Sequence, residues 1–236
     1  MADGHKSSDE ARKCRPPAPL RLLILVLASD NAPEYVAFQR AWTSYMELYP
    51  DIDWLFYVSD PSQTEEIVES QNRLSVRLPE TLEHVYEKTL RILTYLKPRL
   101  LEYDYVLRPN LSTLVHFDRY AAFLASQPRK NAVFSVIGRR GPDTFPSGCC
   151  VAFTPDLLVR LAEERPPYVY LDDVSIGRAL MRWGVSITPI RRFDVTNSIF
   201  PPRVEEDVLC VRIKGPNRMK DVEIFERIAN DAKVVS

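Results

Sequence analysis

The chain has 236 residues, 45% of them hydrophobic, so it can bury a substantial core without the disulfides that a small scaffold needs. Its formal net charge of −1 and pI near 6.3 give no global indication of a nucleic acid or an anionic membrane as partner. The four cysteines, Cys14, Cys149, Cys150 and Cys210, lack the spacing of a CxxC motif or a Cys/His metal site. Reduced thiols and a cytoplasmic location are therefore expected.

No apolar run reaches the roughly 18 residues that a membrane-spanning helix needs. The longest run, residues 22–28, follows basic residues, which also fits a signal peptide. The segment before it carries Asp3, Asp9, Glu10 and several prolines, however, and differs from a short basic leader. We therefore predict a solvated, disordered tail over residues 1–20, followed by a buried first strand over 22–28.

After this strand, the hydrophobic pattern predicts helices and strands in alternation. Asp30-Asn31 is expected to cap a first helix, with Pro33 in its first turn and aromatic residues repeating from Tyr35 to Tyr49. Pro98 is expected to kink or end a long helix over 79–100. Further strands are predicted at 54–58, 74–78, 104–107, 132–137, 149–153, 185–189 and 208–213, and further helices at 119–126, 155–164, 173–183 and 220–232.

This order predicts one α/β domain over residues 21–236, with a mostly parallel central sheet flanked by helices. Such sheets bind ligands at the carboxyl ends of their strands. The chain has no GxGxxG, P-loop or GxSxG motif, which disfavours dinucleotide oxidoreductases, P-loop NTPases and α/β-hydrolases. His84 and His116 fit surface or packing positions better than a catalytic triad or a zinc site.

Two adjacent carboxylates, Asp172 and Asp173, stand where the predicted helix 173–183 begins. The free N–H groups and the positive end of the helix dipole stabilise an anion there. One aspartate can cap the helix while the other accepts a proton. For an isolated Asp-Asp pair, capping by both residues is the simpler interpretation.

Four blocks, EKTLRILTYL, YDYVLRPNLSTLV, FPSGCCVAFTPDLL and YLDDVSIGRAL, occur in this order along the chain. Together they resemble the nucleotide-sugar glycosyltransferases of GT-A (Rossmann-like) fold, in particular the inverting β-1,3-galactosyltransferase and Fringe-like group. The similarity covers about residues 21–225 and looks closest to soluble members of that group from large DNA viruses of algae and amoebae.

The resemblance implies a hexosyl- or pentosyltransferase that uses a UDP-linked sugar donor and a glycan acceptor. Asp173 matches the catalytic base, and Asp172 matches its acidic neighbour. Inversion needs one such carboxylate to take the proton of the acceptor hydroxyl as that oxygen attacks the anomeric carbon. Ser147 and Gly148 match a small-residue turn that faces donor and acceptor, although an ordinary Pro-Ser-Gly turn fits equally well.

The chain departs from this family at the acidic motif that holds a divalent cation. In its place stand Arg108, Asn110 and Ser112, and the last two offer only neutral oxygens to Mn²⁺ or Mg²⁺. We therefore expect no required metal, and we assign Arg108, Asn110 and Ser112 to donor binding.

Other groups must then bind the rest of the donor. Arg212, Lys214 and Arg218 surround a turn and suit the diphosphate, although a solvated basic turn explains them equally well. The nucleoside end is assigned to the strand ends and to one helix lysine, which as an alternative only snorkels along apolar surface. These residues are Ser29, Asn31, Asp60 and Lys88.

Two other classes of function remain open at this point. One is an inactive relative that only binds nucleotide or glycan. The other is a metal-dependent hydrolase or phosphotransferase with Asp172 and Asp173 as metal ligands.

Overall fold

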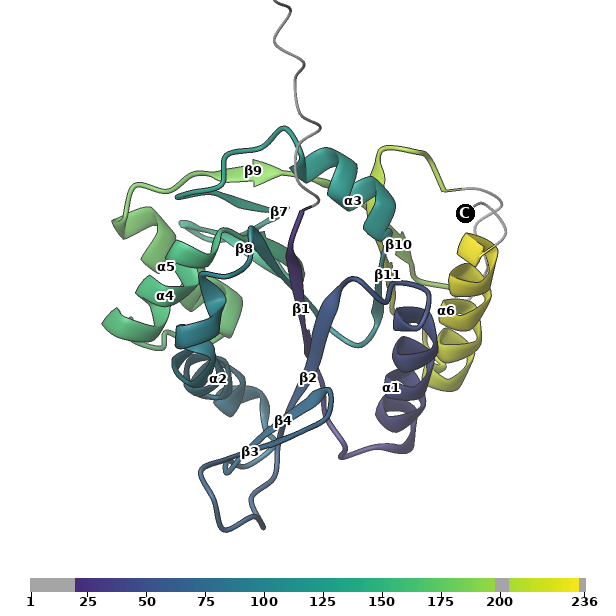
Figure 1. Cartoon of the computed structure of the whole chain (residues 1–236), viewed down its shortest axis with the longest axis horizontal. Helices are drawn as coiled ribbons and strands as arrows, with labels where there is room; N and C mark the ends of the chain where they lie inside the picture. Colours follow the sequence, from purple (N-terminus) through teal and green to yellow (C-terminus); the bar gives the residue numbers. More distant parts are fainter. Residues whose placement is uncertain (1–19, 198–203, 234–236) are drawn as a thin grey trace, which may run out of the picture.

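The structure, a computed structural model, describes residues 20–197 and 204–233. Within these residues the chain forms an eight-stranded sheet in the order β3-β4-β2-β1-β5-β8-β7-β9 (Figure 1). Pairing is parallel from β4 through β2 and β1 to β5, antiparallel on both sides of β8, and parallel again between β7 and β9. This confirms the predicted α/β fold with a mostly parallel central sheet. The strands are β1 (Leu22–Leu27), β2 (Asp53–Ser59), β3 (Ile67–Ser70), β4 (Arg73–Val76), β5 (Tyr105–Pro109), β7 (Val133–Arg140), β8 (Asp143–Phe153) and β9 (Ile187–Pro189).

A second, three-stranded sheet packs beside the first. It pairs β10 (Arg191–Val195) with β11 (Val208–Ile213) in parallel and β11 with β6 (Thr113–Val115) in antiparallel orientation. The helices are α1 (Pro33–Met46), α2 (Val85–Leu100) with the 3₁₀ turn η1 (Leu82–His84) before it, α3 (Phe117–Leu124), α4 (Pro155–Glu164), α5 (Asp172–Arg182) and α6 (Arg218–Lys233).

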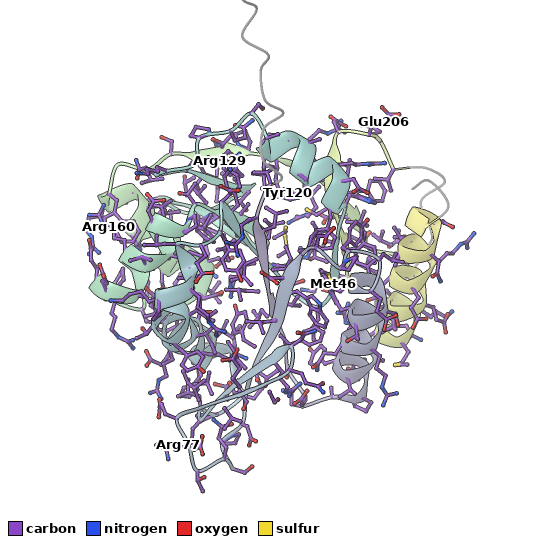
Figure 2. The ribbon with its side chains drawn as sticks, viewed as in Figure 1. Met46, Arg77, Tyr120, Arg129, Arg160 and Glu206 are labelled. Carbon is purple, nitrogen blue, oxygen red and sulfur yellow. The ribbon has the colours of Figure 1, made fainter. Side chains whose placement is uncertain are left out.

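Each face of the central sheet is covered by its own helices, as Figure 1 shows for α2, α4 and α5 on one side and α1 and α6 on the other. Successive residues of a strand point to opposite faces. In β1, Ile24 and Val26 pack toward α1 and α6, whereas Leu23 and Leu25 pack toward α2 and α4. Because both faces are covered, β1 is an almost continuous apolar run, and side chains fill the space between the layers (Figure 2).

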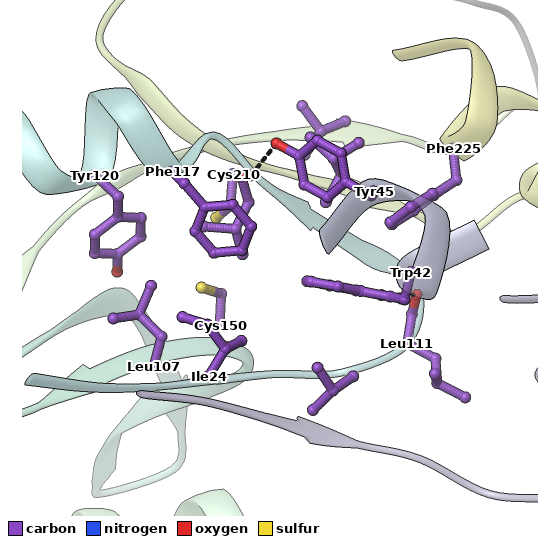
Figure 3. Close-up of a cluster of buried hydrophobic side chains, with 14 of the residues drawn as sticks. Ile24, Trp42, Tyr45, Leu107, Leu111, Phe117, Tyr120, Cys150, Cys210 and Phe225 are labelled. Atoms are coloured by element: carbon purple, nitrogen blue, oxygen red, sulfur yellow. Dashed lines mark hydrogen bonds between the residues drawn. The ribbon is translucent and has the colours of Figure 1, made fainter. Parts of the chain in front are cut away.

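An aromatic cluster joins α1 to the second sheet. Trp42, Tyr45, Phe117 and Phe225 lie together in Figure 3, and Tyr45 stacks on Phe117 with ring centroids 5.6 Å apart. The Trp42 indole donates to the Leu111 carbonyl at 3.0 Å, and the Tyr45 hydroxyl donates to the Val115 carbonyl at 2.7 Å. These bonds hold the loop after β5 in place.

The first helix differs from the prediction at both ends. Its N-cap is Ala32, without a side-chain cap hydrogen bond, and it ends at Met46. Asp30 does not cap it, because its carboxylate instead pairs with Arg73 and accepts from Gln39. Asn31 accepts from the Ser29 hydroxyl.

The long helix α2 also differs from its prediction over residues 79–100. It begins at Val85 and runs through Pro98 to Leu100, so Pro98 does not end it. Pro98 lies on the exposed face, where water can satisfy the unpaired Thr94 carbonyl, while Leu96 and Leu100 keep the opposite face buried.

None of the helices in the described residues is long and apolar enough to cross a bilayer. The predicted tail lies outside those residues except for Leu20. Three cysteines, Cys149, Cys150 and Cys210, are buried free thiols, as expected, and Cys14 lies outside the described part of the chain.

Candidate active site

The parallel order β2-β1-β5 brings the carboxyl ends of three strands to one edge of the sheet. There Asn110 forms a bridge with Leu27, and the Ala28 amide donates to the Tyr57 carbonyl at 3.0 Å. Helix α5 begins close to this edge, because α5 packs along β8, the neighbour of β5.

Asp173 lies in the first turn of α5 with its carboxylate partly buried. Its Oδ1 accepts from the Val174 amide at 2.9 Å, and its Oδ2 lies 3.4 Å from the Gly148 amide nitrogen. Burial raises the pKa of Asp173, and the negative charge of Asp172 raises it further. A carboxylate in this environment binds a proton more readily than an ordinary aspartate.

Asp172 has a different environment. Its Oδ2 accepts from Arg108 Nη2 at 2.5 Å, and Arg108 Nε donates to the Tyr57 hydroxyl at 2.6 Å. The Arg108 side chain is only 6% exposed, so a buried cation neutralises Asp172. Asp173 has no ion-pair partner within the described residues. Leu171, rather than either aspartate, occupies the N-cap position of α5, and no side-chain cap bond forms there.

Ser147 and Gly148 lie inside strand β8, so the expected turn is wrong. The pairing of β7 with β8 shifts between Ser135 and Ile137, and the segment 147–150 bulges out of the ladder as a result. The bulge brings the Gly148 amide toward Asp173. A Cβ built on Gly148 would lie 3.5 Å from the Asp173 Cβ and 3.6 Å from its Oδ2, so any side chain at this position would pack directly against the carboxylate.

Lys88 is almost fully buried, at 1% exposure, and does not snorkel to water. Its ammonium donates to both Glu80 oxygens at 2.9 and 3.0 Å and to the Ala28 carbonyl at 3.2 Å. Burial lowers the pKa of Lys88, and Glu80 partly offsets this. Since Glu80 also accepts from the Ser59 amide at 3.0 Å, the pair holds the ends of β1 and β2 together.

The other residues assigned to the nucleoside, Ser29, Asn31 and Asp60, lie at the same edge of the central sheet. The Ser29 hydroxyl donates to the side-chain Oδ1 of Asn31 at 2.7 Å. Hydrogen bonds from Ser62 lower the pKa of Asp60, which is partly exposed. These groups are close enough to solvent to meet a ligand.

The segment at the position of the family's metal motif forms its own hydrogen-bonded loop. Asn110 Oδ1 accepts from the Thr113 hydroxyl at 2.8 Å and from the Ser112 hydroxyl at 3.3 Å. The backbone N–H of Asn110 donates to the Cys149 carbonyl at 2.9 Å. Nowhere in residues 20–197 and 204–233 do three or more His, Cys, Asp or Glu side chains gather as metal ligands. The residues at this position therefore do not fit a divalent cation held by protein carboxylates.

The cationic candidates near the C-terminus have unequal surroundings. Arg218 donates to the Ile213 carbonyl at 3.0 Å and pairs with the buried Asp221, so it anchors the start of α6. Lys214 is exposed just after β11. Arg212 lies on β11 opposite Thr113 and so reaches the Asn110 loop.

Three residues of the site were missed by sequence reasoning. Glu80 precedes Lys88 by eight positions, a separation that fits no helical pairing rule. Tyr57 lies inside the predicted strand 54–58, and its hydroxyl was given no role. Arg192 lies between the predicted strands 185–189 and 208–213, where no element was expected, and the structure places it in β10.

No protein-family model matches the sequence, and no curated protein matches it. Among solved structures, a glycosyltransferase involved in the glycosylation of the major capsid of PBCV-1 superposes with a TM-score of 0.51 at 15% identity, covering 87% of this chain and 99% of that one. The fold is therefore GT-A-like.

Two looser similarities have TM-scores below 0.5 and add nothing to that conclusion. An active-site mutant of LgtC aligns with a TM-score of 0.47 and 15% identity over 89% of this chain and 95% of its own. A 4-diphosphocytidyl-2C-methyl-D-erythritol synthase from Anaerococcus prevotii aligns with a TM-score of 0.47 and 12% identity over 90% of this chain and 97% of its own. The Fringe-like subgroup stays a prediction.

Proposed function

We propose that this chain is an inverting glycosyltransferase that moves a hexosyl or pentosyl group from a UDP-linked sugar to a hydroxyl of a glycan acceptor. The observation that carries the proposal is the unequal environment of two adjacent carboxylates. Asp172 is neutralised by the buried Arg108, whereas Asp173 is partly buried, has no cationic partner among the described residues and has a raised pKa. An acid–base pair of residues is often recognised by such a difference in environment.

Asp173 would serve as the general base. As the acceptor oxygen attacks the anomeric carbon, its proton passes to an Asp173 carboxylate oxygen, and the bond from the anomeric carbon to the nucleoside diphosphate breaks. A positioned base of this kind contributes roughly 10²–10⁴-fold in rate. The raised pKa brings the carboxylate closer to neutral pH and makes it a stronger base than an ordinary aspartate.

Asp172 and Arg108 would hold the base, Asp173, in position. The ion pair fixes the first turn of α5 against β5, and the Gly148 amide approaches Asp173 from β8. Glycine at position 148 keeps a side chain from packing against this carboxylate.

The donor would lie along the strand ends. In this arrangement Ser29, Asn31 and Asp60 contact the nucleoside, and Asn110 and Ser112 contact ribose or the donor sugar. Arg212 and Lys214 neutralise the diphosphate, since Arg218 is already paired with Asp221. Lys88 supports the site by holding the ends of β1 and β2, because Glu80 and Ala28 occupy its ammonium.

The metal-dependent hydrolase is less well supported. Two carboxylates that share a cation should both be free, yet Asp172 already forms a 2.5 Å contact with Arg108. The inactive binding relative predicts the same nucleotide site without turnover.

A nucleotide-release assay separates the three functions. The chain is incubated with UDP-, GDP-, dTDP- and CMP-linked sugars, with and without chelator, and free nucleotide is measured. We expect slow release from a UDP-sugar, equal with and without chelator, and faster release once an acceptor is added. Complete loss of release with chelator would favour the hydrolase, and absence of release from any donor that binds would favour the inactive relative.

A further inference from the structure

The second sheet presents one face that carries several charges. In β10 and β11, Asp194 is the register partner of Arg212, and Arg192 is the partner of Cys210. Register partners and residues two apart on a strand share a face, so Arg192, Asp194 and Arg212 all point the same way. Thr113 of β6, the partner of Arg212, extends this face toward Asn110.

This face looks onto the bulge of the central sheet. Arg192 Nη1 donates to the Ser147 hydroxyl at 3.0 Å and contacts Cys149 Sγ at 2.6 Å, and Nη2 donates to Asp194 at 2.9 Å. The Cys210 side chain of the same face points toward Cys150 of β8 (Figure 3). The Arg192 side chain is only 12% exposed, and its guanidinium contacts Ser147 and Cys149, the two residues that flank Gly148.

The guanidinium of Arg212 has no hydrogen-bond acceptor among the described residues. Within the described part of the chain it makes no hydrogen bond or ion pair, and its Nε is buried without a partner. A buried polar group without a partner is costly, and a buried charge more so. Its neighbours on the face, Asp194 and Thr113, are already bonded to Arg192 and Asn110. The structure thus leaves a donor without an acceptor beside the Asn110 loop.

We propose that Arg192 and Arg212 together form the diphosphate site of the donor, with Lys214 at its exposed end, in place of a metal ion. This rests on the proposed function and adds Arg192, which the sequence did not indicate. The guanidinium of Arg212 pairs with phosphate oxygens, and Arg192 holds the bulge while adding positive charge beside it. With Lys214, the three cations exceed the single negative charge of Asp194, so the face favours an anion.

The site also explains how the charge of the leaving group can be stabilised without a metal ion. When the bond to the anomeric carbon breaks, the electron pair stays on the diphosphate oxygen. Fixed guanidinium groups beside that oxygen stabilise the new charge without rearrangement.

The test is calorimetric titration of UDP and of uridine, which lacks phosphate, into the full chain and three variants. The variants are Arg192→Gln, Arg212→Gln and the control Arg191→Gln, whose side chain is exposed on the next residue of β10 and pairs with Asp207. We expect UDP affinity to fall tenfold or more in the first two variants and to stay unchanged in the control, with uridine binding equal in all. The loss should shrink with added salt.

Several results would overturn the proposal. Unchanged UDP affinity in Arg212→Gln is decisive, because this substitution removes no hydrogen bond or ion pair within the described residues. Equal losses of UDP and uridine in Arg192→Gln would mean that Arg192 is only a clamp on the bulge. Wild type that binds uridine and UDP equally excludes this diphosphate site, while sugar transfer by that protein leaves the proposed function intact. Wild type that binds no nucleoside diphosphate contradicts the proposed function itself.

Discussion

At the scale of single residues, the site depends on what surrounds two adjacent aspartates. Their place at a helix start could be predicted, because an apolar stripe at helical spacing follows them. Their unequal roles could not, because Arg108 lies 64 positions before Asp172 in the sequence. The pKa of Asp173 is likewise a consequence of burial, which depends on the packing of α5 against β8.

This burial leads to a stability prediction. The folded chain binds a proton at Asp173 more tightly than the unfolded chain does, so the ionised carboxylate disfavours folding above its raised pKa. That disadvantage disappears as pH falls below the ordinary aspartate value. Asp173→Asn should therefore be more stable than wild type at pH 7.5, and its advantage should shrink toward pH 4.

Denaturant unfolding at both pH values measures this difference. Asp118→Asn, at an exposed aspartate in the first turn of α3, controls for the removal of one negative charge. A stability gain of equal size at both pH values, or a loss at pH 7.5, would mean that burial does not penalise the Asp173 charge.

At the scale of elements, the helices and most strands of the central sheet were predictable, whereas the first half of β8 and the short strands β3, β6 and β10 were not. Strand β6 has only three residues, and β10 is largely exposed, so neither shows a hydrophobic pattern. Both pair with β11, which is the next strand after β10 but lies far along the chain from β6, and local propensity does not contain that pairing. The sheet face that carries Arg192 and Arg212 therefore could not be predicted in full.

Helix α5 fits closely against β8 at Gly177. A Cβ on this residue would lie 2.5 Å from the Phe145 Cβ and 2.7 Å from its Cα, so backbone would have to shift. Glycine at position 177 therefore permits the close packing of α5 on β8. Gly177→Ala should destabilise the fold by about 1–3 kcal/mol and lower activity, because the start of α5 carries the proposed base.

The comparison for this variant is Met181→Ala, an exposed change on the same helix at 67% exposure. Thermal unfolding and sugar-transfer rates of the two variants are measured together. If Gly177→Ala has wild-type stability and rate, the contact between α5 and β8 does not position the site.

At the scale of the whole molecule, the proposed site draws on both sheets. The strand ends of β1, β2 and β5 bound one side, the bulge of β8 and the start of α5 another, and the face of β10 and β11 the third. Sequence alternation was enough to predict the parallel sheet and its binding edge, because covered parallel strands are continuously apolar. The meeting of the two sheets depends on the aromatic cluster around Trp42 and on buried bonds to the loop after β5.

The central claim is that Asp173 is the base of a sugar transfer. The measurement is the turnover of sugar transfer and the affinity for donor in Asp173→Asn and in the control Asp118→Asn. Asparagine keeps the shape and the hydrogen bond from the Val174 amide but cannot take a proton, so turnover should fall by about 10²–10⁴-fold while donor affinity and the control stay unchanged. Near-normal transfer by a folded Asp173→Asn variant would contradict the claim.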